Sequence, residues 1–231
     1  MAAGGKSRGK GAGGSSASDD HQRLSKDRVA QAAVELLDAH GIKGFSMRKL
    51  AEHLGSGVMS VYWHVANKEA VYDLALDTVL AYKAERPIPA RGATHPNWSD
   101  RVLDVLVDWR ACMLRHPWSA PLLPQRMLGH STLARLEILA QALIDGGVPE
   151  KEIKGAIWSL WNHLMGATLT LVSFMAMHEP DGSANPKEAP PVAGATAYPS
   201  LERLDLLADD DWDGAFEAGI RLILRGVTAH P

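Results

Sequence analysis

Apolar residues recur at helical spacing along most of this chain. In the first such stretch, one stripe is formed by Val29, Ala32, Ala33, Leu36 and Leu37. This i, i+3, i+4, i+7 spacing is typical of an amphipathic helix with one face toward a core. No segment alternates apolar and polar residues in the way that would predict a β-strand. The pattern therefore predicts an all-α protein.

Capping residues and glycines mark the ends of the predicted helices in the first third. Ser25 suits an N-cap, and Gly41 suits the left-handed residue that ends the same helix. Ser46 and Asn67 are N-cap candidates for two later helices, and Gly55-Ser56-Gly57 predicts a tight turn between short helices. The predicted helices are 25–40, 47–54, 58–64 and 67–84. Two short helices joined by a three- or four-residue turn are typical of a helix-turn-helix motif.

Beyond residue 87 the pattern predicts a helical second part. A linker rich in Pro, Gly and Ala comes first, and the prolines of segment 117–124 allow only short helical pieces. Residues 179–199 hold five prolines and predict a mobile loop. Asp211 is the expected N-cap of the last helix. The predicted helices here are 98–116, 132–145, 149–178 and 212–228.

Composition adds three constraints. Residues 1–22 are rich in Gly and Ser and almost free of large apolar side chains, so we predict a disordered tail. The single cysteine, Cys112, cannot form an intrachain disulfide, which favours a reducing compartment such as the cytoplasm. The net charge of -3 is uneven, with ten Lys and Arg against seven Asp and Glu in residues 1–70 and 14 against 20 in the rest. A basic front third suggests contact with an acidic polymer.

Several motifs fall at the predicted helix-turn-helix. They are Phe45-Ser46-Met47-Arg48-Lys49-Leu50-Ala51, Leu54-Gly55, and Tyr62-Trp63-His64-Val65 followed by Asn67-Lys68. With them, the stretch from Val29 to Leu76 resembles the DNA-binding domain of the TetR family of bacterial transcriptional regulators. The resemblance implies a three-helix DNA-binding domain over residues 23–70 and a helical ligand-binding and dimerisation domain over residues 71–231.

The resemblance also assigns roles at the DNA. Val58, Met59 and Ser60 match positions that reach base edges, although Val58 and Met59 offer only apolar contacts, as to a thymine methyl group. Arg48 is the candidate for a bidentate guanine contact, and the alternative is a solvated cation. Phosphate contacts are expected from helix starts and neighbouring residues. We predict that Trp63 packs between helices. For His64, a phosphate contact and packing between helices are both open. The candidate set is Ser46, Met47, Arg48, Val58, Met59, Ser60, Tyr62, Trp63, His64 and Lys68.

From Ala156 to Met177 the long predicted helix is apolar on every side. Asn162 and His163 lie in its middle, where they would be costly in lipid, so we predict a buried bundle helix and no membrane segment. Since the family pairs its last two long helices into a four-helix dimer interface, we expect a homodimer. An apolar stripe on the last helix would supply the surface that meets the second chain. The alternative is that it belongs to an ordinary core within one chain. The stripe consists of Trp212, Phe216, Ile220, Ile223 and Val227.

Trp and Met residues with a few polar groups suggest a site for a flat, largely apolar effector. An ordinary packed core is the alternative. The candidate ligand-binding residues are Trp109, Met113, Met127, His130, Trp158, Trp161, Asn162 and Met165. The magnesium-binding histidine of tetracycline-responsive relatives aligns with Leu123, and the other histidines lack ligand spacing, so no metal or other cofactor is expected.

These observations predict a ligand-responsive, homodimeric repressor that leaves a palindromic double-stranded DNA operator when a small-molecule effector binds. An activator of the same family is an open alternative. An all-α enzyme is disfavoured, because the sequence holds no GxSxG, HExxH, CxxC or Rossmann glycine motif.

Overall fold

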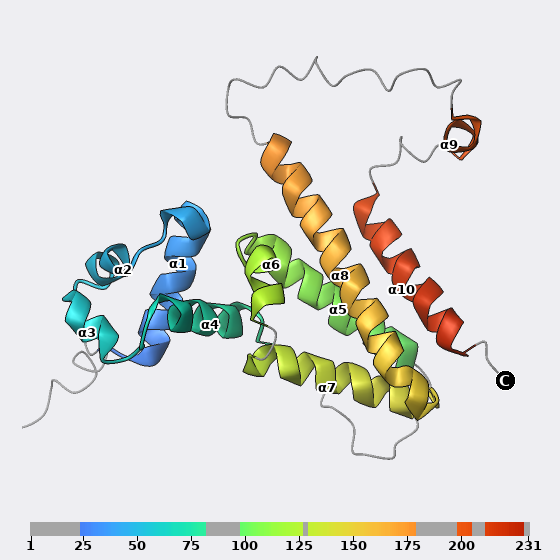
Figure 1. The fold of residues 1–231 in the computed structure, drawn as a ribbon, viewed down its shortest axis with the longest axis horizontal. Helices are drawn as coiled ribbons and strands as arrows, with labels where there is room; N and C mark the ends of the chain where they lie inside the picture. Colours follow the sequence, from blue (N-terminus) through green and yellow to red (C-terminus); the bar gives the residue numbers. More distant parts are fainter. Residues whose placement is uncertain (1–23, 82–97, 127–128, 179–197, 205–210, 229–231) are drawn as a thin grey trace, which may run out of the picture.

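The computed structural model of this chain is built of helices (Figure 1). It describes residues 24–81, 98–126, 129–178, 198–204 and 211–228. These contain no β-strand, which confirms the all-α prediction. The elements are α1 (Lys26–Gly44), α2 (Met47–His53), α3 (Val58–Tyr62), α4 (Lys68–Val79), α5 (Trp98–Arg115), α6 (Ser119–Leu122), a 3₁₀ turn η1 (Leu123–Gln125), α7 (His130–Asp145), α8 (Glu150–His178), α9 (Pro199–Arg203) and α10 (Trp212–Thr228).

The four predicted N-caps are confirmed. In each, the side-chain oxygen accepts a hydrogen bond of 2.8–3.3 Å from the main-chain N–H three residues later. One of the donors that a helix start otherwise leaves unsatisfied is thereby paired, which typically contributes about 1 kcal/mol per helix. The capping residues are Ser25, Ser46, Asn67 and Asp211.

Gly41 bends the first helix rather than ending it. Its φ of 62° and ψ of -177° lie in a region that side-chain-bearing residues essentially do not occupy. Helical hydrogen bonding resumes beyond it, so α1 reaches Gly44. The glycine was therefore predicted correctly as a break, but the helix extends four residues further than expected.

Other boundaries differ by small amounts. Helix α7 begins at His130, two residues before the predicted start. Helix α9 was not predicted; it begins at Pro199, the last residue of the expected loop, where proline suits a first helical position. Helix α4 ends at Val79, five residues before the predicted end. The predicted tail, most of the predicted loop and residues 82–84 lie outside the described residues.

The helices form two groups joined through α4. Figure 1 shows α1, α2 and α3 beside α4 on one side, and α5, α7, α8 and α10 as a bundle on the other. Helix α4 packs on α1 and also on α7, so it belongs to both groups. A continuous buried core runs through both. Within the described part of the chain, no helix is long and apolar enough to cross a membrane.

Helices α8 and α10 run antiparallel, side by side (Figure 1). The stripe on α10 that was expected to meet a second chain instead packs inside this one. Phe216 and Ile220 are buried against α8, and Trp212 lies 5.6 Å from Phe174 between ring centroids. For Phe216 and Ile220 the alternative of an intrachain core is therefore the correct one, while Trp212, Ile223 and Val227 are half-buried.

The kink at Gly41 leads to a test of stability. We expect Gly41→Ala to lower the free energy of unfolding by about 1–3 kcal/mol, because alanine cannot adopt this backbone conformation without strain. Chemical denaturation measures the change. His40→Ala, at the exposed neighbouring position, is the control and should stay within about 0.5 kcal/mol of the parent. Equal stability of the two variants would contradict the strain argument.

Candidate nucleic-acid interface and ligand-binding region

Helix α3 is held by two valines and presents its other side to solvent. Val61 and Val65 are buried in the core, as their spacing predicted. Gly55, with φ of 63°, makes the turn that separates α3 from α2. On the outward side Met59 is 73% exposed and Trp63 is 87% exposed. The motif therefore offers an apolar, solvent-facing surface at the start and end of a short helix.

The packing role predicted for Trp63 is wrong. Its ring is among the most exposed in the described chain, while the residues on either side of its turn, Val61 and Val65, take the inward positions. An exposed Trp beside exposed Met59 and Tyr62 makes an apolar patch of the kind that marks interaction sites. Trp63 thus fits a contact role better than a packing role.

Arg48 extends from α2 into solvent. Its Nε donates to Glu52 Oε1 at 2.9 Å, one helical turn away. Exposed pairs of this kind contribute only about 0.3–0.5 kcal/mol, so Arg48 can exchange Glu52 for another acceptor at small cost.

Lys68, a predicted phosphate contact, is bonded to the protein itself. Its Nζ donates to the Phe45 main-chain oxygen at 3.1 Å. It also lies 5.7 Å and 5.4 Å from the ring centroids of Phe45 and Tyr72. Lys68 therefore fastens the start of α4 to the connection between α1 and α2, and its charge partly faces inward.

The other predicted DNA contacts differ in how free their side chains are. Ser46 Oγ is engaged as the N-cap of α2. Met47 is half-buried against the core, and His64 is also half-buried. Val58, Ser60 and Tyr62 are exposed. The predicted DNA-contacting residues therefore lie on α2, α3 and the start of α4, but not all of their side chains are free to contact DNA.

A pair between α1 and α2 supports this end of the molecule. His53 Nε2 lies 2.8 Å from Glu35 Oε2 and, with a second hydrogen bond from Gln31, holds the pKa of the Glu35 carboxyl below its usual value. A lowered folded-state pKa contributes stability above the ordinary Glu pKa, and this contribution is lost as the pH falls through the lowered value.

The predicted ligand-binding residues separate into three places. Trp109, Met113, Trp161 and Met165 are all buried in the core between α5 and α8. Trp109 and Trp161 meet edge to face, with ring centroids 5.4 Å apart. Any ligand here would have to displace these side chains, although the buried Trp109 Nε1 has no hydrogen-bond partner among the described residues.

The remaining candidates do not join that group. Trp158 is 42% exposed and Asn162 is also exposed, both on the outward side of α8, so the prediction that they line a pocket with Trp161 is wrong. His130 is exposed at the start of α7. Met127 lies outside the described residues.

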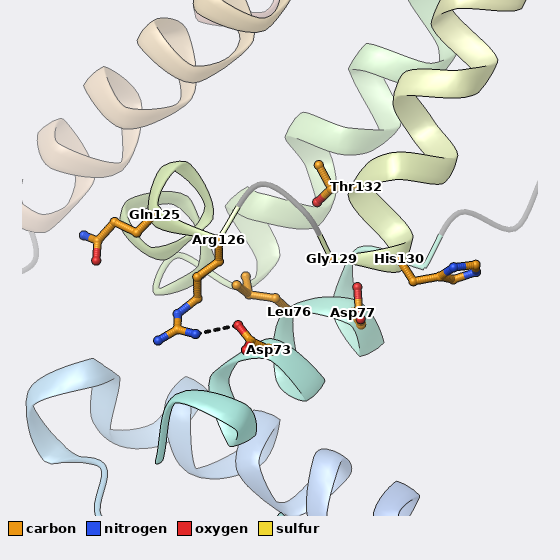
Figure 2. Close-up of a pocket in the computed structure, with 8 residues that line it drawn as sticks. All are labelled: Asp73, Leu76, Asp77, Gln125, Arg126, Gly129, His130 and Thr132. Atoms are coloured by element: carbon orange, nitrogen blue, oxygen red, sulfur yellow. Dashed lines mark hydrogen bonds and ion pairs between the residues drawn. The ribbon is translucent and has the colours of Figure 1, made fainter. Parts of the chain in front are cut away.

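A cleft of about 500 Å³ opens between α4 and the corner that runs from η1 to α7 (Figure 2). Of its residues only His130 was predicted. The missed signal is a pair of carboxylates four residues apart on one face of α4. The lining consists of Asp73, Leu76, Asp77, Gln125, Arg126, Gly129, His130 and Thr132.

Arg126 closes one side of this cleft. It forms an ion pair with Asp73 at 2.5 Å, drawn in Figure 2, and donates to the Glu69 main-chain oxygen at 3.1 Å. The Asp73 side chain is 53% exposed and that of Arg126 19%. A pair open to solvent to this degree contributes about 0–1 kcal/mol.

Asp77 caps α7 from a different helix. The N-cap position of α7 is Gly129, which has no side chain to offer. Asp77 Oδ1 instead accepts from the Ser131 main-chain N–H at 3.0 Å, and Ser131 Oγ donates to the Asp77 main-chain oxygen at 2.8 Å. A Cβ on Gly129 would lie 2.8 Å from Asp77 Oδ1, so glycine is what permits the close approach.

Two further contacts join the helical groups. Arg135, fully buried, donates from Nε to the Leu80 main-chain oxygen at 2.9 Å and from its terminal nitrogen to Asp108 at 2.7 Å. Asp38 on α1 accepts hydrogen bonds from the His116 ring at 2.8 Å and from Trp118 Nε1 at 2.6 Å. In the described ranges no three His, Cys, Asp or Glu side chains gather as a metal site, and Leu123 is buried.

Two families match this chain. Residues 30–75 match the family described as "Bacterial regulatory proteins, tetR family", and residues 89–230 match "Tetracyclin repressor-like, C-terminal domain". An HTH-type transcriptional regulator of Saccharopolyspora erythraea is 32% identical over 207 residues, covering 89% of this chain and 85% of the relative.

Solved structures give the same picture. A transcriptional regulator of the TetR type from Streptomyces coelicolor is 29% identical, with a TM-score of 0.72 over 90% of this chain and 100% of the other. ActR from the same organism, in complex with (S)-DNPA, is 28% identical, with a TM-score of 0.67 over 90% and 98%.

The burial of the tryptophans leads to a paired test. We expect Trp161→Ala to lower the free energy of unfolding by about 3–5 kcal/mol, because it leaves a cavity beside Trp109. Trp63→Ala should change it by no more than about 0.5 kcal/mol, because that ring is in solvent. Urea unfolding followed by circular dichroism measures both, and similar losses in the two variants would show that Trp63 packs after all.

Proposed function

Because this chain belongs to the TetR family of bacterial regulatory proteins, we propose that it is a ligand-responsive repressor that binds a palindromic operator as a homodimer. It regulates transcription by binding DNA and acts in the cytoplasm, where bacterial DNA lies. The observation that carries the proposal is the outward face of α3, exposed at Met59 and Trp63 while Val61 and Val65 anchor it.

This geometry suits the DNA major groove. A short helix projecting from a tight turn can enter a groove about 12 Å wide. The first turn of α3 would meet base edges through Val58, Met59 and Ser60, with apolar contacts favouring thymine methyl groups. Arg48 would reach a guanine, and Trp63 and Tyr62 the flanking backbone.

Phosphate contacts are proposed at helix starts. The N-termini of α2 and α4 carry outward main-chain N–H groups and a partial positive charge that favour anions. Ser46 and Lys68 stand at these starts, with Met47 and His64 near them. The DNA-binding domain would then comprise residues 23–70, and residues 71–231 would receive the ligand and form the dimer.

The dimer surface is proposed on the outward faces of α8 and α10. On α8 this face holds Trp158, Asn162 and Gly166, and on α10 it holds Ala218 and the exposed Leu222. Small residues beside exposed apolar ones allow two helix pairs to approach closely. This face replaces the inward stripe from which the dimer was first expected.

The effector is proposed to act through α4. ActR, a structural relative, was solved with (S)-DNPA bound, which supports a small-molecule ligand here as well. A ligand weakens DNA binding only if it favours an arrangement of the helices that binds DNA less well. Helix α4 contacts α1, α7 and the cleft, so its position can couple ligand binding to DNA binding.

The operator is the first test. A two-fold dimer places its recognition helices one DNA turn apart, about 34–36 Å, or a multiple of it. Selection of bound sequences from random DNA with the purified protein should yield a near-palindrome bound by two chains. An asymmetric half-site bound by a single chain would overturn the homodimeric model.

The two cations provide a second test. Arg48→Ala should relax the preference at one base pair by about 1–3 kcal/mol of discrimination. Lys68→Ala should weaken binding to all sequences alike and, unlike Arg48→Ala, should also lower stability, because Lys68 Nζ bonds to Phe45. Binding to operator variants and thermal unfolding separate the two effects. An unchanged preference profile in Arg48→Ala would leave Arg48 as a backbone contact or a solvated cation.

A further inference from the structure

Helix α4 is fastened to the helical core through acceptors that lie on one face. Positions 73, 77 and 80 are spaced i, i+4, i+7, and each meets a donor from the core. Arg126 donates to Asp73, the Ser131 main-chain N–H to Asp77, and Arg135 to the Leu80 oxygen. Two of these acceptors are carboxylates, so α4 places two negative charges on the donors that border the cleft.

The first of these attachments is easily exchanged. Asp73 is more than half exposed, so its pairing with Arg126 favours the docked arrangement by no more than about fivefold. Arg126 Nε is buried and has no hydrogen-bond partner among the described residues, so its donor capacity is not fully used. A carboxylate or similar anion with two oxygens can satisfy an arginine by paired hydrogen bonds.

The cleft beside Arg126 provides space for such a ligand. Its volume of about 500 Å³ is within the range of small-molecule sites. Gln125, His130 and Thr132 add polar groups, and Leu76 adds an apolar one. Figure 2 shows Arg126 and Asp73 meeting across the cleft, between η1 and α4.

We propose that this cleft is the effector site and that its ligand is a small molecule bearing a carboxylate or comparable anionic group, which replaces Asp73 on Arg126. The inference rests on the proposed function and specifies where and what its effector is. It differs from the sequence expectation of a largely apolar ligand at the buried tryptophans.

Competition between the ligand and Asp73 for Arg126 couples ligand binding to the position of α4. While Asp73 and Asp77 hold the donors, a third anion would be repelled by them. The ligand therefore binds better when α4 has moved away from the core, and this differential affinity is what shifts the population. Since α4 follows α3 within six residues and packs on α1, its movement displaces the recognition helix.

The probe for the test is 2-naphthoate, with 2-naphthylmethylamine as a control of opposite charge. Calorimetry at constant ionic strength measures binding to the full chain, and a fluorescent fragment of the selected operator reports DNA affinity. We expect saturable binding of naphthoate and a loss of DNA affinity at saturation of up to about fivefold per chain, which is the most that displacing one exposed ion pair supplies. The amine should do neither.

Two variants of the same ion pair should respond in opposite ways. Arg126→Gln should lose naphthoate binding and the DNA response, whereas Asp73→Asn should bind naphthoate up to about fivefold more tightly, because the internal competitor is gone. A general loosening of the structure would instead change the naphthoate affinity of both variants in the same direction. The matched control is Arg101→Gln, since Arg101 is 16% exposed and pairs with Asp145 at 3.6 Å away from the cleft. It should behave as the parent.

Absence of saturable naphthoate binding, equal binding by Arg126→Gln, or weaker binding by Asp73→Asn would each overturn this inference. These results leave the proposed function intact as long as the protein binds its selected DNA. Failure to select any DNA would overturn the proposed function instead.

Discussion

The hydrogen bond from the Ser131 N–H to the Asp77 carboxylate is the contact on which the arrangement of the two helical groups depends. A helix start leaves main-chain donors without partners, and the glycine at the N-cap of α7 cannot supply one. The acceptor therefore comes from α4, which must lie close enough for Asp77 to reach. One requirement of α7 thus constrains the position of α4, and α4 in turn packs on α1.

Burial strengthens this attachment three residues further along, at the C-terminal end of α4. Arg135 is fully enclosed, and a buried guanidinium is tolerated only when its donors are paired. Its partners are the Leu80 and Val105 main-chain oxygens and Asp108, and the Trp109 ring lies 5.5 Å away. Breaking this set would leave an uncompensated charge, so it specifies one position for the end of α4 more than it adds net stability.

The sequence predicts what depends on local chemistry. The four caps, the break at Gly41 and the inward direction of Val61 and Val65 follow from residue type and helical spacing, and all are confirmed. Spacing does not reveal which neighbour a face will meet. Trp158 and Trp161 are three residues apart on α8, yet one is exposed and the other buried.

Contacts between segments that lie far apart in the sequence could not be predicted from it. Asp73 and Arg126 are 53 positions apart, and neither residue is unusual in its own surroundings. The cleft exists only because η1 and α7 turn toward α4, which no periodicity encodes. The candidate DNA contacts could be named from one continuous motif, whereas the pocket residues were assigned from composition and fell in three places.

The unequal attachments of α4 determine how it can move. Its C-terminal end is held by the enclosed Arg135, while the ties nearer its start and on α1, through Asp73 and Asp38, are partly open to water. Exposed pairs open at small cost and buried ones do not. A displacement of α4 would therefore pivot near Leu80 and be largest near Lys68. Because Lys68 is bonded to Phe45 and the chain runs directly from α3 into α4, the first helical group would move with that end. The contacts that open most easily thus lie near the N-terminal end of α4. There a small displacement at the cleft would move α3 the most.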